Sequence, residues 1–208
     1  MISAYKGAEN MNSNINHSEH LMDEIMDYNR EFVDTKAYEP YMTSKFPDKR
    51  MVVLTCMDTR LVELLPRAMN LRNGDVKVIK SAGAIVSHPF GSIMRSILVA
   101  IYELKSTEIA IVGHYECGMA SLDPNSILTK AKEHGVDPAT IEMVNACGVD
   151  LHKWLSGFQS VEESVSKSVK MVRQHPLLPA HVAVHGLIIH PETGELTWVE
   201  NGYEQIKT

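Results

Sequence analysis

The sequence predicts an α/β fold, a single domain with a mainly parallel β-sheet flanked by helices, preceded by an N-terminal helical arm. Three short apolar runs, Met51–Thr55, Val76–Ser81 and Glu108–Gly113, alternate with helical patterns. Strands and helices that alternate at short spacing are typical of βαβ units, which form parallel sheets with right-handed crossovers. With 208 residues, the chain is most simply one domain that is large enough for a sizeable core.

Composition and charge narrow the classes of function. Hydrophobic residues make up 44% of the chain and charged residues 22%, which is typical of a globular protein. The net charge of −6 and the scattered Lys and Arg residues argue against a nucleic-acid partner. The apolar runs are too short for a membrane span, and residues 1–16 lack the apolar region of a signal peptide. The three cysteines are too few for a disulfide scaffold and indicate a reducing compartment, by default the cytoplasm.

The N-terminal part, residues 1–37, is expected to be a flexible arm followed by a helix, and residues 38–208 to form the α/β domain. Residues 1–16 are polar and show no period. Ser18 is a suitable cap for a helix over residues 19–35. This helix has one apolar stripe, which predicts packing either on its own domain or across a dimer interface. The stripe consists of Leu21, Ile25, Tyr28 and Phe32.

The first half of the α/β domain contains the three expected strands and two helices. A short helix is expected near residues 63–70, with Pro66 in its first turn, the position that tolerates proline. Asn73-Gly74 marks a turn before the second strand. Apolar residues recur at helical spacing over residues 92–104, which predicts an amphipathic helix before the third strand.

The second half begins with helical, polar sequence. Proline after aspartate at 124 and 138 predicts two helix starts. Cys147, at the end of the second helix, is expected to be a free thiol in the core. Ser160 opens a capping-box match before a third helix. Residues 181–190 are typical of a buried strand, and residues 196–200 of an edge strand that completes a hairpin.

Two cysteines and a histidine follow the expected strands. Cys56 comes directly after the first strand, and His114 and Cys117 follow the third. Because ligands of open α/β sheets bind outside the carboxyl ends of strands, these side chains meet if the two strands are neighbours. Two thiolates and an imidazole suit zinc, and three protein ligands leave one position open, as in catalytic sites. Two alternatives remain: plain core cysteines, and a structural zinc site, which usually has a fourth ligand.

An acid and a base stand close to the first cysteine. If residues 56–60 are extended, Cys56, Asp58 and Arg60 project to the same side. A structural ion pair at the end of a strand is the alternative interpretation of Asp58 and Arg60.

The segment around the second cysteine combines a helix start with two glycines. Cys117 is expected to open the next helix, where the macrodipole favours a thiolate. Gly113 and Gly118 are expected to let the backbone turn tightly around a bound group.

The pattern Cys-x-Asp-x-Arg followed by His-x-x-Cys resembles the signature of the β-class carbonic anhydrases. The resemblance extends from about Met51 to Leu122, and more weakly to the C-terminal strands. The segment Lys80–Ala84 also looks like the glycine-bearing loop of that family, but serine and alanine stand where the family commonly has asparagine. The resemblance implies a zinc lyase that hydrates carbon dioxide reversibly to bicarbonate by a zinc-bound hydroxide, and a homodimer or higher homo-oligomer.

The resemblance also implies the role of each site residue. Cys56, His114 and Cys117 would hold Zn2+, and Asp58 and Arg60 would be catalytic. Asp58 would either accept a hydrogen bond from the hydroxide or bind zinc itself and close the site, while Arg60 orients Asp58. Two other functions stay open: hydrolysis of carbon disulfide or carbonyl sulfide, and zinc binding without turnover. The Asp58–Arg60 pair argues against the second of these.

Overall fold

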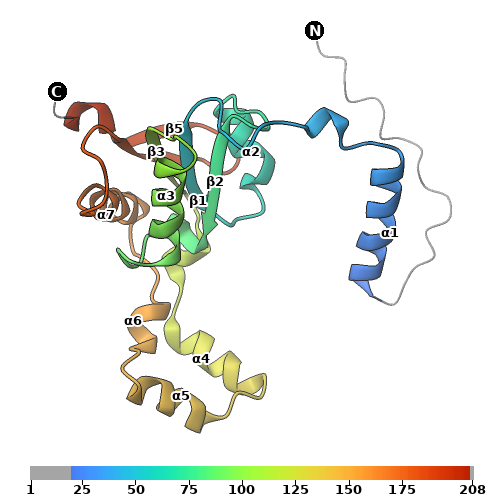
Figure 1. Ribbon diagram of the computed structural model, residues 1–208. Coiled ribbons are helices and arrows are strands. Elements are labelled where there is room, and N and C mark those ends of the chain that lie inside the picture. Colours follow the sequence, from blue (N-terminus) through green and yellow to red (C-terminus); the bar gives the residue numbers. More distant parts are fainter. Residues whose placement is uncertain (1–19, 207–208) are drawn as a thin grey trace. The chain divides into compact units, whose positions relative to one another are not determined.

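A five-stranded β-sheet forms the centre of the protein, as a computed structural model that describes residues 20–206 shows (Figure 1). The strands lie in the order β2-β1-β3-β4-β5. The first four are parallel, and β5 pairs antiparallel with β4. This sheet, with helices beside it, confirms the predicted fold class and the C-terminal hairpin. The strands are β1 (Met51–Cys56), β2 (Val76–Ser81), β3 (Glu108–His114), β4 (Ala183–Ile189) and β5 (Leu196–Glu200).

The central strands are buried on both faces. All seven residues of β4 are buried, as are all those of β1 after Met51. Successive side chains of a strand point to opposite faces, so a sheet that is covered on both sides requires such continuous apolar runs. β2 and β5 lie at the edges, and their residues are half-buried or exposed.

Helices cover the two faces of the sheet unequally. On one face, α3 (Ser92–Tyr102) and α7 (Val161–Arg173) share a large core with the strands. On the other face, α2 (Leu61–Ala68) contributes Leu61 and Leu65 to a smaller core. Ser160 caps α7 as predicted, because its hydroxyl accepts a hydrogen bond from the backbone N–H of Glu163.

α2 differs from its prediction. The helix begins at Leu61, two residues before the expected start, so Pro66 lies in its interior and not in its first turn. The hydrogen bond that Pro66 cannot donate would go to the carbonyl of Val62. Val62 is 55% exposed, so water can take the place of this bond.

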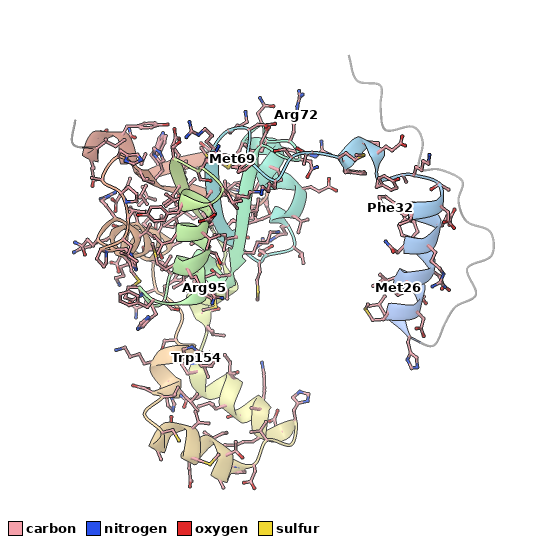
Figure 2. The ribbon with its side chains drawn as sticks, viewed as in Figure 1. Met26, Phe32, Met69, Arg72, Arg95 and Trp154 are labelled. Atoms are coloured by element: carbon pink, nitrogen blue, oxygen red, sulfur yellow. The ribbon has the colours of Figure 1, made fainter. Side chains whose placement is uncertain are left out.

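Three short helices form a lobe that projects from the sheet (Figure 1). They are α4 (Pro124–Glu133), α5 (Pro138–Ala146) and α6 (Leu151–Leu155). Asp123 and Asp137 cap the first two, which confirms the predicted starts, whereas five-residue α6 is too short to give a periodic signal. None of the helical residues is buried, and Trp154 on α6 is 69% exposed (Figure 2).

Cys147, at the end of α5, is exposed. The prediction of a core thiol is therefore wrong. The prediction relied on the frequent burial of free cysteines, but the helices of this lobe contain no buried residue.

The described residues fall into two compact units, and the boundary between them comes after Thr43. The first unit contains α1 (Leu21–Asp34) and a 3-10 turn at Glu39–Tyr41. α1 confirms the expected N-terminal helix, although it begins at Leu21 and no side chain caps it. None of its residues is buried.

Two predictions for the N-terminus lie outside the described residues: the flexible arm at 1–16 and the cap at Ser18. The division at residue 37 stays a prediction. Within the described part of the chain, no helix combines the length and the apolar character that crossing a membrane requires.

Gly113 lies inside β3 under α7. A Cβ atom at this position would lie 2.7 Å from Cγ2 of Val165 and 2.8 Å from Cγ2 of Val161. Both valines are β-branched residues of a helix, so their side chains have little freedom to move away. Gly113 therefore allows α7 to approach the sheet and does not make the tight turn expected from the sequence.

We expect Gly113→Ala to lower the free energy of unfolding by about 1–3 kcal/mol, because the added methyl overpacks the contact between β3 and α7. Urea unfolding of the metal-free protein measures the change as a lower midpoint. Gly118→Ala is the matched control, because a Cβ at Gly118 has no atom within 4 Å. Equal midpoints for the two variants would show that α7 does not depend on Gly113.

Candidate metal centre

Two loops meet at the carboxyl edge of the sheet. β1 and β3 pair in parallel with Thr55 opposite Val112, so both strands end at the same edge. Cys56 is the last residue of β1, and His114 is the last residue of β3. Cys117 follows in the loop after β3. The register of one strand pair thus brings together the three side chains that the sequence singles out.

The two cysteines and the histidine form a buried cluster. The Sγ atoms of Cys56 and Cys117 are 3.9 Å apart, and these atoms and a ring nitrogen of His114 all lie within 4.8 Å of one another. Two sulfur atoms bound tetrahedrally to zinc at about 2.3 Å lie about 3.8 Å apart, so the sulfur spacing fits a zinc ion. Among residues 20–206, this is the one group of three or more Cys, His, Asp or Glu side chains close enough to hold a metal.

The His114 ring is oriented for a metal. Its Nδ1 lies 2.8 Å from the carbonyl oxygen of Tyr115 and donates to it in one tautomer. In that tautomer Nε2 carries a lone pair, and this atom is buried without a hydrogen-bond partner. Histidine ligands of metals usually donate their other ring N–H to a carbonyl or carboxylate, which fixes the tautomer. This Nε2 nitrogen is therefore available as a metal ligand beside the two thiols.

The two thiols differ in acidity. Burial opposes ionisation of Cys56, but the His114 imidazole and the N–H groups of Gly83 and Asp58 outweigh it and lower the pKa to about 7. Burial and the charge of Cys56 raise the pKa of Cys117 to about 11. Without a cation, Cys56 is thus the thiol that ionises first, and Cys117 stays protonated at neutral pH. A divalent ion makes the second thiolate favourable, so metal binding and deprotonation are coupled.

Cys117 precedes only a four-residue 3-10 helix, Gly118–Ser121. The expectation that a helix opening at Cys117 stabilises its thiolate is therefore not supported, because so short a helix has little macrodipole. The raised pKa of Cys117 agrees with this correction.

Gly83 supports the cluster from the neighbouring loop. Its N–H donates a hydrogen bond to Sγ of Cys56 at 3.3 Å. The φ angle of Gly83 is 71°, a left-handed value that favours glycine, and an added Cβ would lie 3.0 Å from the ring of Phe158. The resemblance to the family points to this glycine-bearing loop, but it assigns no role to Gly83.

Asp58 and Arg60 form a bidentate ion pair beside the cluster. Nε of Arg60 lies 3.1 Å from Oδ1 of Asp58, and Nη2 lies 3.0 Å from Oδ2. These contacts lower the pKa of Asp58 to about 2, so its carboxylate is ionised at neutral pH. Oδ2 of Asp58 also lies 3.7 Å from Nε2 of His114, so one carboxylate touches both the arginine and the cluster.

The extended conformation proposed for residues 56–60 is wrong. Arg60 has helical dihedral angles as the residue before α2, and its N–H donates to Oδ1 of Asp58 at 2.9 Å. The aspartate therefore closes a turn, in competition with an extended backbone. The turn and the side-chain bonds together bring Asp58 and Arg60 into contact.

Glu116 is a further member of the site that the sequence analysis did not identify. Its carboxylate lies 3.3 Å from Nη1 of Arg60, and its carbonyl oxygen lies 3.3 Å from Nη2. The φ angle of Glu116 is 56°, which is unusual for a residue other than glycine. A charged residue between two expected ligands was the available signal, but only the structure shows which cation it meets.

Comparisons with known proteins agree with this geometry. The pattern that defines the carbonic anhydrase family matches residues 51–196, which are more than half of the chain. The Bacillus subtilis protein YvdA, whose name assigns it provisionally to the carbonic anhydrases, is 63% identical over 180 residues, covering 86% of this chain and 91% of its own. A carbon disulfide hydrolase of Acidithiobacillus thiooxidans is 32% identical over 158 residues, covering 72% of this chain and 76% of its own.

Among solved structures, the β-carbonic anhydrase isoform I of Trichomonas vaginalis matches with a TM-score of 0.80 and 36% identity. The match covers 88% of this chain and 100% of that one. The sequence pattern, the relatives and the solved fold agree, and the chain therefore belongs to the β-carbonic anhydrase family of lyases.

Proposed function

We propose that this protein is a zinc-dependent carbonic anhydrase that converts carbon dioxide and water reversibly to bicarbonate and a proton. The observation that carries the proposal is the buried cluster of Cys56, His114 and Cys117 with an ionised Asp58 in contact with His114. The donor set suits zinc, and three ligands leave one coordination position for chemistry. When bound, zinc lowers the pKa of a coordinated water and so supplies the nucleophile.

The side chains of the protein position the reaction. In this proposal, Asp58 accepts a hydrogen bond from the nucleophile and directs its lone pair toward the substrate. Arg60 keeps Asp58 ionised and holds its two oxygens in one plane through two parallel hydrogen bonds. Asp58 lies close enough to His114 to compete for the open position when the nucleophile is scarce.

Stopped-flow hydration of carbon dioxide, on protein of measured zinc content, tests the proposed function. We expect turnover that scales with zinc content. Zinc-loaded protein that does not accelerate hydration at any pH up to about 9 would contradict the proposal.

Hydrolysis of carbon disulfide is the second candidate, and the relative from Acidithiobacillus thiooxidans favours it. Carbon dioxide and carbon disulfide are both small, neutral and linear, so a nucleophile held at the same cluster could attack either. Parallel assays of carbon dioxide and carbon disulfide with one preparation decide between them. A higher kcat/KM for carbon disulfide would assign the protein to the second reaction.

We expect about one zinc per chain, and loss of most of it in Cys117→Ser and in His114→Ala, because each variant removes one of three ligands. Metal analysis of the purified proteins gives the result. Cys147→Ser is the matched control, since this thiol is exposed on the lobe, and it should retain the full zinc content. Unchanged zinc in either ligand variant would contradict the assignment.

The rate of hydration should depend on pH through Asp58. Its pKa of about 2 leaves the carboxylate available throughout the neutral range, so Asp58 competes for the open position until alkaline pH favours the nucleophile. Turnover should therefore be low near neutrality and rise through about pH 8. Arg60→Ala should move this rise to higher pH by up to about 0.7 unit, because exposed ion pairs contribute at most about 1 kcal/mol.

The pH profile of turnover for the wild type, Arg60→Ala and Asp58→Asn measures these effects. Asp58→Asn loses the charged acceptor, so its maximal turnover should fall even at high pH. A wild-type profile that is flat from about pH 6.5 to about 9, with Arg60→Ala identical, would rule out competition by Asp58.

The N-terminal helix supports a homo-oligomer. α1 exposes large apolar side chains and has no buried residue. Such a helix is only marginally stable in water unless its apolar side is covered. Five of these side chains are Leu21, Met22, Ile25, Met26 and Tyr28. We infer that α1 is covered when two or more chains associate. The cytoplasmic location stays a prediction.

Sedimentation at micromolar concentration should show a dimer or a larger assembly. Ile25→Glu should shift the equilibrium toward monomer, because it places a charge in the apolar stripe of α1. Glu31→Gln, which changes an exposed polar residue of the same helix, should leave the assembly unchanged. An active, stable monomer in the wild type would refute the inference.

A further inference from the structure

Glu116 lies between two of the proposed zinc ligands, two residues after His114 and one before Cys117. It contacts Arg60 through two different groups, its carboxylate and its own carbonyl oxygen. Arg60 lies in the loop that follows the third proposed ligand, Cys56, and immediately precedes α2. The contacts of Glu116 with Arg60 therefore join the two loops that carry the cluster.

Arg60 is shared between two carboxylates. Asp58 accepts from Nε and Nη2, and Glu116 accepts from Nη1 at the outer edge of the same guanidinium. The side chain of Asp58 is 19% exposed and faces the cluster, whereas that of Glu116 is 65% exposed and faces solvent. One cation thus has an inner and an outer anionic partner at the same time.

We propose that Glu116 is a positioning residue: it is the alternate partner of Arg60 that lowers the cost of moving Asp58 from Arg60 to the open position of the metal. This role rests on the proposed function, in which Asp58 competes for that position. When Asp58 leaves, Arg60 would otherwise lose its carboxylate partner. Because Nη1 is already paired with Glu116, the guanidinium keeps an ion pair in both states.

The backbone of Glu116 supports this role. Its left-handed φ of 56° is strained for a residue with a Cβ, and glycine would adopt it freely. Glycine would retain the carbonyl contact with Arg60 but not the carboxylate contact. The side chain is therefore the part of Glu116 that the proposal concerns, and a conservative variant can isolate it.

Glu116→Gln is that variant, because it keeps an oxygen acceptor for Nη1 and removes the charge. Without a competing carboxylate, Arg60 should hold Asp58 more firmly, so the open position of the metal should be free more often. An exposed ion pair changes an equilibrium constant by about two- to fivefold, which sets the size of the effect. The sign is opposite to that of Arg60→Ala, which releases Asp58.

The test is the affinity of the cobalt-substituted protein for thiocyanate, an anion that competes with Asp58, followed in the visible absorption spectrum at one pH and ionic strength. Glu116→Gln should bind thiocyanate about two- to fivefold more tightly than the wild type, and Arg60→Ala should bind it more weakly. In the Arg60→Ala background, Glu116→Gln should have no effect, because its role requires Arg60. Glu63→Gln is the matched control, since it removes an exposed carboxylate that pairs with Arg67.

The outcomes separate the two proposals. A protein that binds no cobalt would refute the metal centre, and Arg60→Ala without effect would refute the competition by Asp58 and with it the role of Glu116. If Arg60→Ala weakens binding but Glu116→Gln does not strengthen it, the role of Glu116 alone is wrong. The same strengthening in both backgrounds, or in Glu63→Gln, would show a general charge effect and would also overturn the role.

Discussion

The parallel pairing of β1 with β3 is the constraint on which the site depends. With Thr55 opposite Val112, the two strands end at the same edge, and the loops that follow them start side by side. A shift of the register by one residue would turn every side chain of one strand to the other face. The buried cores on both faces fix the register, since most residues of both strands are apolar and enclosed. The energy that positions the cluster therefore comes from hydrophobic burial in the sheet and not from the metal.

The close approach of α7 to β3 also helps to position the site. Gly113 immediately precedes His114, and its missing side chain lets Val161 and Val165 press against β3. Packing at this point fixes the backbone one residue before a proposed ligand. The backbone carbonyl of Tyr115, one residue after it, then sets the tautomer of the imidazole. His114 is thus held from both sides along the chain, which is the preorganisation that a metal ligand needs.

Much of this arrangement could be predicted from the sequence, because the strands and the cluster residues depend on local patterns. Apolar runs and turn residues gave the bounds of β2 as the structure has them, and those of β1 and β3 to within one residue. The turn at Asp58 was missed because it depends on a side-chain bond to the backbone, which competes with the extended form that the spacing indicated. The exposure of Cys147 depends on the absence of an interior in the lobe, and the partner of Glu116 depends on a contact 56 residues away in the chain. Local patterns carry no information about either.

The charges at the site favour a neutral ligand over an anionic one. With a divalent ion bound, the thiolates of Cys56 and Cys117 cancel its charge. Asp58 and Glu116 then outnumber Arg60, which leaves these groups with one net negative charge. A neutral electrophile meets no electrostatic barrier at such a centre, whereas an anion is repelled over the few ångströms at which charges in a partly buried site interact strongly. In the proposed function, this arrangement would assist release of bicarbonate more than capture of carbon dioxide. By pairing with Arg60, Glu116 both shares the cation that restrains Asp58 and contributes the charge that makes the centre negative.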